Sequence, residues 1–350
     1  MPPSEAQKAV EEMAKQMRNL DSATAAQMIQ EYGSTYQALQ RDLNRLLREA
    51  KERDLKPWQI MRMQRLKQLE AQFISNVTRF SNVAGNSITT AQRAAVGLST
   101  QNAPLVANAA LPQGVTLNTL AEVGLGWNRL PTEAFDAFVG ISGEGKPIGN
   151  LLEPLGEEAA GNIKAAIRSG IMRGKAPGVV ASDIRRVAGM PLGRALTISR
   201  TEINRAHREA TRLNYYANSN IVKGWRRLAS KDSTTCIACI ALDGTLYENE
   251  EPIDSHPNCR CAMVPETLQY SDLGLDVPDL EQPPDATAWF NEQSASTQQK
   301  MLGKAKYDAL KRGKVKSLKD FVAVKDDPVW GKTASVASDK SLGLERVGAK

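Results

Sequence analysis

The residues best suited to bind a metal ion lie together in one short segment. Residues 236–261 hold all four cysteines of the 350-residue chain and one of its two histidines. Thiolate and imidazole groups suit zinc, whereas magnesium and calcium prefer oxygen ligands. We therefore expect one bound zinc ion, held by four of five candidate ligands: Cys236, Cys239, His256, Cys259 and Cys261.

The spacing of these residues leaves two possible sets of four ligands. Cys236 and Cys239 form a C-x2-C pair, and the second half reads H-x2-C-x-C, whereas a tetrahedral zinc ion takes four donors. If the end of the segment is a strand, Cys259 and Cys261 point to the same side and an all-cysteine site follows. If it is a turn, His256 and Cys259 pair instead. The fourth ligand is thus His256 or Cys261.

The order of the ligands does not fit a catalytic zinc site. A zinc deaminase has an H-x-E before its P-C-x-x-C motif, but neither His207 nor His256 begins an H-x-E. The H-E-x-x-H motif of zinc hydrolases is absent as well. Four sulfur-rich ligands leave no open position for water. We expect a structural ion, no catalytic residues, and a protein that is not an enzyme.

Two other interpretations of the cysteines are possible. A redox C-x2-C pair would normally open a helix in a thioredoxin-like βαβ unit, and the sequence predicts no such unit. The cysteines would otherwise be reduced core residues without a metal.

Short strands and a turn are predicted around the candidate ligands. Val222, Trp225 and Leu228 are the apolar points of one strand-like segment. The segment RCAMVPE predicts a second strand, ended by Pro265. Between them, the Asp-Gly pair at 243–244 is a hairpin signal and would let the chain reverse between the two halves of the site.

The first hundred residues predict a bundle of helices. Pro57 stands at the favoured first position of a second helix. Residues 86–110, rich in small and polar residues, are either a closely packed helix or a mobile connector. Apolar residues recur at spacings of three and four, as on one face of a helix, in two stripes: Tyr32, Tyr36, Leu39, Leu43, Leu46 and Ala50, then Leu66, Leu69, Phe73, Val77 and Phe80.

Further helices are predicted on both sides of the cysteines. One ends near Gly174, and Ser182 or Asp183 caps or begins a short helix after it. The next has one face of small and apolar residues: Leu196, Ser199, Ile203, Ala206, Ala210, Leu213 and Ala217. After the cysteines, three short helices are predicted, with breaks near Gly303 and Gly313.

These elements predict a mainly helical α+β fold. It has a helical N-terminal half, a compact zinc-stapled α+β core and a small helical C-terminal segment. The expected regions are a helical region at 1–110, a connector with short helices at 111–150, a core with the metal site at 151–268, a linker at 269–285, a small helical segment at 286–325 and a mobile tail at 326–350.

Composition and charge narrow the class of protein. No run of 18 uncharged apolar residues predicts a membrane span. The polar, acid-bearing N-terminal segment resembles neither a signal peptide nor a transit peptide, so we expect a cytoplasmic site of synthesis, where clustered cysteines more often bind metal. The net charge of +6 is either an ordinary basic surface or one that contacts nucleic acid or an acidic protein.

Several motifs follow one another in a fixed order along the second half of the chain. The residues concerned are Arg200, Thr201, Glu202, Arg205, Ala206, Trp225, Cys236, Cys239, Leu242, Asp243, Gly244, His256, Pro257, Cys259, Arg260 and Cys261. They form R-T-E-x-x-R-A, a tryptophan-bearing strand, C-x2-C, L-D-G and H-P-x-C-R-C. This order resembles the phage Mu F-like family of minor head proteins, which includes the SPP1-type head-morphogenesis proteins. The resemblance is firm over residues 185–266 and looser to about 322.

The resemblance implies a minor capsid protein of a tailed bacteriophage, made in the cytoplasm of the infected bacterium. Such proteins lie in the head interior or at the portal vertex of the virion and assist head morphogenesis. The implied partners are the portal protein and the inner capsid, with the packaged DNA as a further candidate.

Two other functions were compared with this one. Mu F-like modules can be fused to effector domains, so a phage-associated toxin or nuclease is one rival. The lysine-rich segment after residue 266 offers it no evident nucleophile–base pair. The other rival is a zinc-stapled DNA-binding virion protein, whose phosphate contacts would be Arg226, Arg227, Lys231 and Arg260.

Glu202 of the R-T-E motif carries one further hypothesis. We expect its carboxylate to accept hydrogen bonds from Arg205 or from the metal-binding loop, and so to dock the helix there. The simpler alternative is a solvated pair three residues apart on a helix, which stabilises a protein only slightly.

Overall fold

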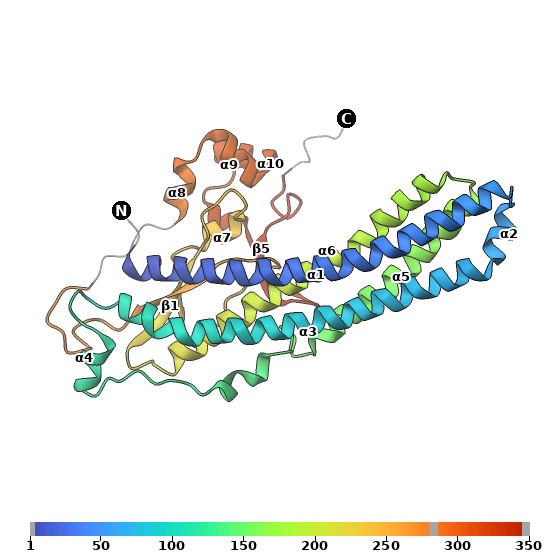
Figure 1. The fold of residues 1–350 in the computed structure, drawn as a ribbon. Coiled ribbons are helices and arrows are strands. Elements are labelled where there is room, and N and C mark those ends of the chain that lie inside the picture. Colours follow the sequence, from blue (N-terminus) through green and yellow to red (C-terminus); the bar gives the residue numbers. More distant parts are fainter. Residues whose placement is uncertain (1–3, 280–285, 345–350) are drawn as a thin grey trace. The chain divides into compact units, whose positions relative to one another are not determined.

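The computed structural model describes residues 4–279 and 286–344, and it confirms a mainly helical α+β fold (Figure 1). The elements before the first strand are α1 (Glu5–Glu52), α2 (Pro57–Arg62), α3 (Gln64–Ala109), α4 (Leu117–Glu122), the 3-10 helix η1 (Thr132–Phe138), α5 (Ile148–Met172) and α6 (Pro177–Tyr216). Those that follow are β1 (Val222–Leu228), α7 (Ile237–Ala241), β2 (Leu246–Glu248), β3 (Ala262–Thr267), α8 (Ala286–Glu292), α9 (Ala295–Leu302), α10 (Lys304–Lys311), the 3-10 helix η2 (Leu318–Phe321), β4 (Val322–Asp327) and β5 (Gly331–Val336).

The chain forms two compact units whose segments alternate along the sequence. The core unit consists of Met1–Arg18, Arg93–Ala137 and Asn204–Lys350, and the helical unit of Asn19–Gln92 and Phe138–Ile203. Helices α1, α3 and α6 each have residues in both units. Among the described residues, no helix is long and apolar enough to cross a membrane.

The helical unit has a core to which both predicted apolar stripes contribute. Leu43, Leu66 and Ile167 are among its most buried side chains. The full cluster takes residues from α1, α3, α5 and α6: Leu39, Leu43, Leu46, Leu47, Leu66, Leu69, Phe73, Val77, Ala159, Ile163, Ile167, Ile171, Val180 and Ile184. The spacing of three and four therefore correctly placed the cluster residues of α1 and α3, except Leu47, on buried helix faces, whereas those of α5 and α6 were not predicted.

The structure corrects two predicted helix boundaries and decides between the two alternatives left open for residues 86–110. Pro57 does begin a helix, but α2 ends at Arg62 because Met63 is extended (ψ 128°), and the second stripe lies on α3. Residues 86–109 continue α3, so the helix is the right alternative there. The two helices expected after Gly174 are one, α6, which begins at Pro177; proline is favoured at this first helical position.

The core unit contains a three-stranded antiparallel sheet in the order β2-β1-β3. Strand β1 was predicted, whereas β2 was not. Strand β3 continues through Pro265 to Thr267 instead of ending there, because an edge strand tolerates a residue without an N–H. A side chain at Gly224 would place its Cβ 2.4 Å from the Tyr247 carbonyl oxygen, so the approach of β1 to β2 requires glycine.

The predicted linker is partly folded onto the core unit. Tyr270 and Leu273 are buried in its hydrophobic cluster, and the Tyr270 hydroxyl donates a hydrogen bond to the Ala110 carbonyl at 2.9 Å. Residues 280–285, the rest of this linker, lie outside the described residues.

The C-terminal region is helical up to Lys311, as predicted, but it is divided differently and contains one unexpected hairpin. The helix expected before Gly303 is two helices, α8 and α9, and the segment after Gly313 forms only the 3-10 helix η2. Gly303 and Gly313 have positive φ values of 75° and 70° and lie at the expected breaks. Strands β4 and β5 pair over Val322–Val336, where a helical segment and then a mobile tail were expected, so that expectation is wrong for 326–336. Asp327 closes the turn by accepting hydrogen bonds from two following backbone N–H groups. The end of the expected tail, 345–350, lies outside the described residues.

Candidate metal centre

The structure brings all five predicted ligands together in the core unit. Cys236 is the N-cap of α7, and its Sγ accepts a hydrogen bond from the Cys239 backbone N–H at 3.4 Å. His256 and Cys259 belong to one tight turn, closed by a bond from the Cys259 N–H to the His256 carbonyl at 3.1 Å. Cys261 directly precedes β3. The ligand side chains of a short helix, a tight turn and the residue before a strand thus converge on one site.

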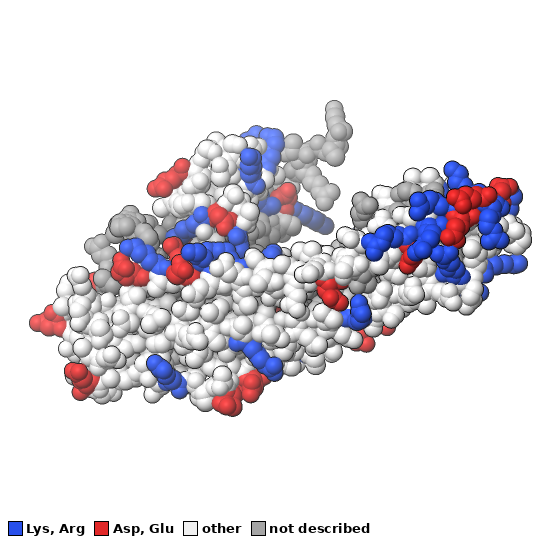
Figure 2. Space-filling model, viewed as in Figure 1, with Lys and Arg blue, Asp and Glu red and all other residues white. Residues whose placement is uncertain are grey.

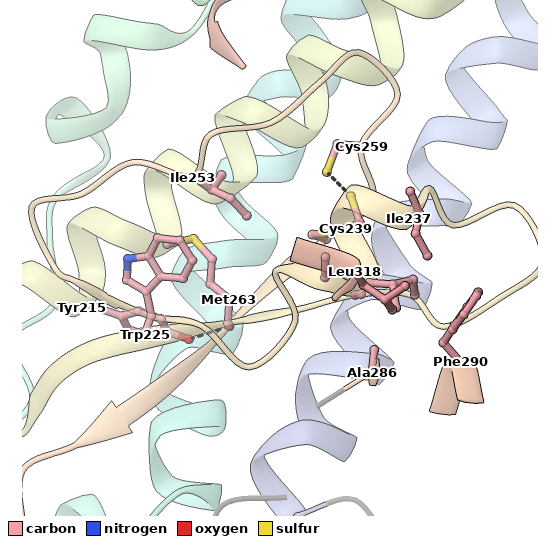
Figure 3. Close-up of a cluster of buried hydrophobic side chains, with 14 of the residues drawn as sticks. Tyr215, Trp225, Ile237, Cys239, Ile253, Cys259, Met263, Ala286, Phe290 and Leu318 are labelled. Carbon is pink, nitrogen blue, oxygen red and sulfur yellow. Dashed lines mark hydrogen bonds between the residues drawn. The ribbon is translucent and has the colours of Figure 1, made fainter. Parts of the chain in front are cut away.

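The donor atoms form two overlapping groups of three that share Cys239. His256 Nε2 lies 3.0 Å from Cys236 Sγ and 3.2 Å from Cys239 Sγ. Cys239 Sγ lies 3.8 Å from Cys259 Sγ (Figure 3). The groups are Cys236, Cys239 and His256, then Cys239, Cys259 and Cys261, each with its donor atoms within 4.8 Å of one another. All four cysteines are free, and the five side chains are close enough to hold a metal ion.

The sulfur separation and the histidine orientation both fit a bound metal. Two thiolates on one tetrahedral zinc ion, each about 2.3 Å from it, lie roughly 3.8 Å apart, as Cys239 and Cys259 do. His256 Nδ1–H donates to the Pro257 carbonyl at 2.8 Å. This bond leaves the Nε2 lone pair directed at the sulfurs, which is how a ligating histidine is usually oriented.

The thiols and the imidazole strongly perturb one another. A hydrogen bond from Cys239 and the proximity of His256 lower the pKa of Cys236 to about 4, against the effect of burial. Burial lowers the pKa of His256, but Cys236 and Cys259 raise it, with a net result of about 9. Hydrogen bonds from Cys239 and Cys261 also lower the pKa of Cys259, whereas hydrogen bonds with the other sulfurs and burial raise the pKa of Cys239. Without a metal ion the site therefore favours thiolates at Cys236 and Cys259, next to the positive charge of His256, and a bound metal cation would supply the positive charge that all of the ligating sulfurs need.

A buried arginine supplies a permanent positive charge beside the sulfurs. Arg227 on β1 is 1% exposed. Its Nη2 donates to Cys239 Sγ at 3.4 Å and to Cys259 Sγ at 3.7 Å, and its Nη1 donates to the Asp254 carbonyl at 3.0 Å. Burial lowers the pKa of this guanidinium, but the neighbouring cysteines raise it well above its ordinary value.

Two arginines of α6, neither of them predicted from the sequence, hold the loop that carries His256 and Cys259. Arg208 is buried and donates to the Cys259 carbonyl at 3.3 Å and to Ser255 Oγ at 3.0 Å. Arg212, one turn later, donates to the Asn249 carbonyl at 3.2 Å. The spacing of four residues between them was the available signal, because it puts both on one helix face.

An apolar cluster surrounds the ligands and excludes water from one side. Trp225 is fully buried and stacks on Tyr247 with ring centroids 4.3 Å apart. Figure 3 shows Trp225 beside Tyr215 and Met263, with Cys239 and Ile237 in the same cluster. Trp225, which was predicted as an apolar point of a strand, therefore belongs to the core that supports the site.

The residues predicted as phosphate contacts are engaged inside the protein. Arg227 is buried and donates to the cysteine sulfurs, so the prediction that it contacts phosphate is wrong. Arg226 makes a two-pronged pair with Glu266 at 2.8 and 3.1 Å. The other two also pair with acids, Lys231 with Asp243 at 3.4 Å and Arg260 with Asp232 at 2.9 Å.

Glu202 is buried in the helical unit. Its Oε1 accepts a hydrogen bond from the Gly143 N–H at 3.3 Å, and its carbonyl accepts one from Gln92 Nε2 at 3.4 Å. The carboxylate thus holds the loop before α5. The hypothesis that it also docks the helix through Arg205 or the metal-binding loop stays a prediction.

Taken together, the fold and the site define a mainly helical α+β protein with a buried cysteine–histidine centre beneath a long helix. Residues 161–264 match the model of a known family, described as phage Mu protein F like protein. The chain therefore contains a phage Mu F-like domain, which supports a general role in phage head morphogenesis and a place in the virion. No curated protein and no solved structure matches the chain.

Proposed function

We propose that this protein is a minor capsid protein of a tailed bacteriophage that binds the portal protein or the inner capsid during head assembly. The observation that carries the proposal is the family match over residues 161–264, which covers all of α6, β1 and β2 and all five candidate ligands. Synthesis in the cytoplasm of the host bacterium and residence at the portal vertex or in the head interior follow from the same proposal.

The metal centre has a structural role in this proposal, and the protein is not an enzyme. The ion would be zinc, because three thiolates and an imidazole suit its softness and tetrahedral geometry. Cys236, Cys239 and Cys259 are the surest ligands. With four protein ligands in place, no coordination position is left for water, so the ion would tie α7 to the turn before β3.

We further infer that His256 is the fourth ligand and that Cys261 stays beside Arg227. The Nε2 lone pair of His256 faces two sulfurs at 3.0 and 3.2 Å, an arrangement that needs a proton or a metal ion between them. Cys261 lies close to Cys239 and Cys259, where the positive charge of Arg227 stabilises its sulfur.

Elemental analysis of the purified protein tests the zinc site. We expect one zinc ion per chain in the wild type and its loss, with a lower melting temperature, in Cys236→Ser. Cys261→Ser should keep one zinc ion, whereas His256→Ala should bind it more weakly. A wild-type protein that is folded and free of metal would refute the structural zinc, and zinc loss in Cys261→Ser alone would reverse the ligand choice.

A binding assay tests the assembly role separately. The portal protein encoded by the same phage genome is immobilised, and retention of the purified chain is measured at physiological salt. Disruption of the gene should also reduce the yield of infectious, DNA-filled heads. Normal heads without this protein, together with no binding to portal or capsid, would contradict the proposal.

A further inference from the structure

Positive charge is concentrated in one short stretch of the core unit. Residues 300–319 contain eight lysine or arginine residues and one acidic residue, Asp308, which gives this stretch a net charge of +7. The whole chain carries +6, one less than this stretch. The rest of the chain is therefore slightly acidic, and the basic character of the protein comes from these residues.

Most of these cations lack an acidic partner. Lys304 pairs with Asp308 at 3.0 Å, and Lys306 pairs with Asp339. The other six are exposed and form no ion pair with any residue that the structure describes: Lys300, Lys311, Arg312, Lys314, Lys316 and Lys319. We call these six residues the basic surface. Around the metal centre, by contrast, Arg226, Lys231 and Arg260 each have an acidic partner.

The basic surface stands on an ordered apolar base. Leu302, Val315 and Leu318, which alternate with the cations, are buried in the cluster that includes the metal ligands. Gln298 fixes the start of α9 by donating to the Phe290 carbonyl at 3.0 Å. Figure 2 shows lysine and arginine side chains gathered over α10. The cations are thus presented on one folded surface, which reduces the entropy lost when they bind a partner.

We propose that the basic surface binds the sugar-phosphate backbone of double-stranded DNA without reading its sequence. Five of its six residues are lysines, which act as point charges towards phosphate, whereas bidentate base recognition favours arginine. A membrane-inserting surface would require exposed large hydrophobic side chains. Among the described residues 286–321 there are none. The charge pattern itself indicates a polyanion. The choice of DNA among polyanions rests on the proposed head function.

A second charged region of the chain serves as a comparison. Residues 41–67 of the helical unit contain nine basic and four acidic residues, and pairs such as Arg65–Glu49 at 2.7 Å neutralise part of the charge. Blue and red side chains are mixed there in Figure 2. This region therefore offers cations for a matched control.

Fluorescence anisotropy with a labelled duplex of about 30 base pairs tests the proposal at several salt concentrations. Because each phosphate contact releases a counterion, six contacts give a slope of about −5 in a plot of log K against log salt. The triple variant Lys311→Gln, Arg312→Gln and Lys314→Gln should bind at least about tenfold more weakly and flatten the slope by about 3. The control triple variant Arg41→Gln, Arg48→Gln and Lys51→Gln should keep most of the affinity.

Three outcomes would overturn the inference. The first is no binding of the full-length wild type at about 50 mM salt, where backbone contacts are strong. The second is an equal loss of DNA affinity in the control variant, which would mean that binding depends on the total charge and not on the basic surface. The third is tighter binding to vesicles rich in phosphatidylserine than to DNA. Circular dichroism confirms that each variant is folded. Failure here leaves the portal-binding assay unaffected, so the two proposals fail separately.

Discussion

Arg227 shows how a single buried charge can support a sulfur-rich site. Its guanidinium contacts two cysteine sulfurs and one loop carbonyl. Groups that support metal ligands in this way typically change metal affinity by about 10- to 100-fold. We expect Arg227→Met to weaken zinc binding by a factor in this range, measured by competition with a chelator. Arg226→Met, one residue earlier and paired with Glu266, should leave the affinity unchanged; an equal effect of both would contradict this role.

His207 should make the protein sensitive to acid. Its imidazole is buried, with Nε2 unpartnered among the described residues, and burial followed by the charge of Arg208 lowers its pKa to about 3. The unfolded chain therefore takes up this proton below about pH 6.5 while the folded chain does not. Stability falls as the pH decreases from about 6.5 towards 3, by up to about 1.4 kcal/mol per pH unit.

Urea unfolding of the wild type and of His207→Gln between pH 7 and pH 4 checks this dependence. Metal release in acid affects both proteins, so the informative quantity is the difference between their slopes. The variant should lose less stability per pH unit. Parallel curves would mean that His207 does not remain neutral in the folded protein.

At the scale of elements, α5 carries two glycines with opposite expected effects. A Cβ at Gly170 would lie 2.8 Å from Val180 Cγ2 on α6, whereas a Cβ at Gly161 meets nothing within 4 Å. Gly170→Ala should lower the melting temperature, because α5 and α6 must move apart. Gly161→Ala should stabilise the protein by about 0.5–1 kcal/mol, the helix-propensity difference between the two residues. Thermal denaturation of the two variants checks both signs.

Sequence patterns predicted the elements better than they predicted the roles of charged residues. The ligand cluster was found because C-x2-C and H-x2-C-x-C are local patterns, and α1 and α3 because their stripes are long. The faces of β1 could not be assigned, since a bulge between Val222 and Gly224 breaks the alternation of side chains. Arg226 and Arg227 therefore looked equivalent, although one pairs with Glu266 and the other with sulfur.

The missed hairpin has a different cause. Strands β4 and β5 contain small and polar residues, so their hydrophobic signal is weak. Thr333 and Ala334 are nevertheless buried, because they pack on other parts of the core unit, which the local sequence does not reveal. The side chains that settle the ligand geometry come from segments about 20 residues apart, and their final approach depends on the same tertiary packing.

For the whole molecule, removal of zinc should affect the two units differently. The proposed ion ties together segments of the core unit, whereas the cluster of the helical unit contains none of its ligands. We expect a chelator to increase hydrogen exchange in residues 222–267 while the buried stripes at 39–47 and 66–77 stay protected. Hydrogen exchange followed by mass spectrometry measures both regions in one experiment. Equal deprotection of both would show that the metal controls the entire fold.

Because segments of the two units alternate along the sequence, the boundaries of the family match do not coincide with the boundaries of either compact unit. The family match begins inside α5 and ends in β3, so it contains parts of both units and the whole of neither. The metal centre lies in this stretch, yet Ala103 and Leu111, which help to enclose its core, come from far upstream. A fragment cut at the boundaries of the family match would therefore lose apolar residues that pack around the site, so studies of the site need these flanking segments as well.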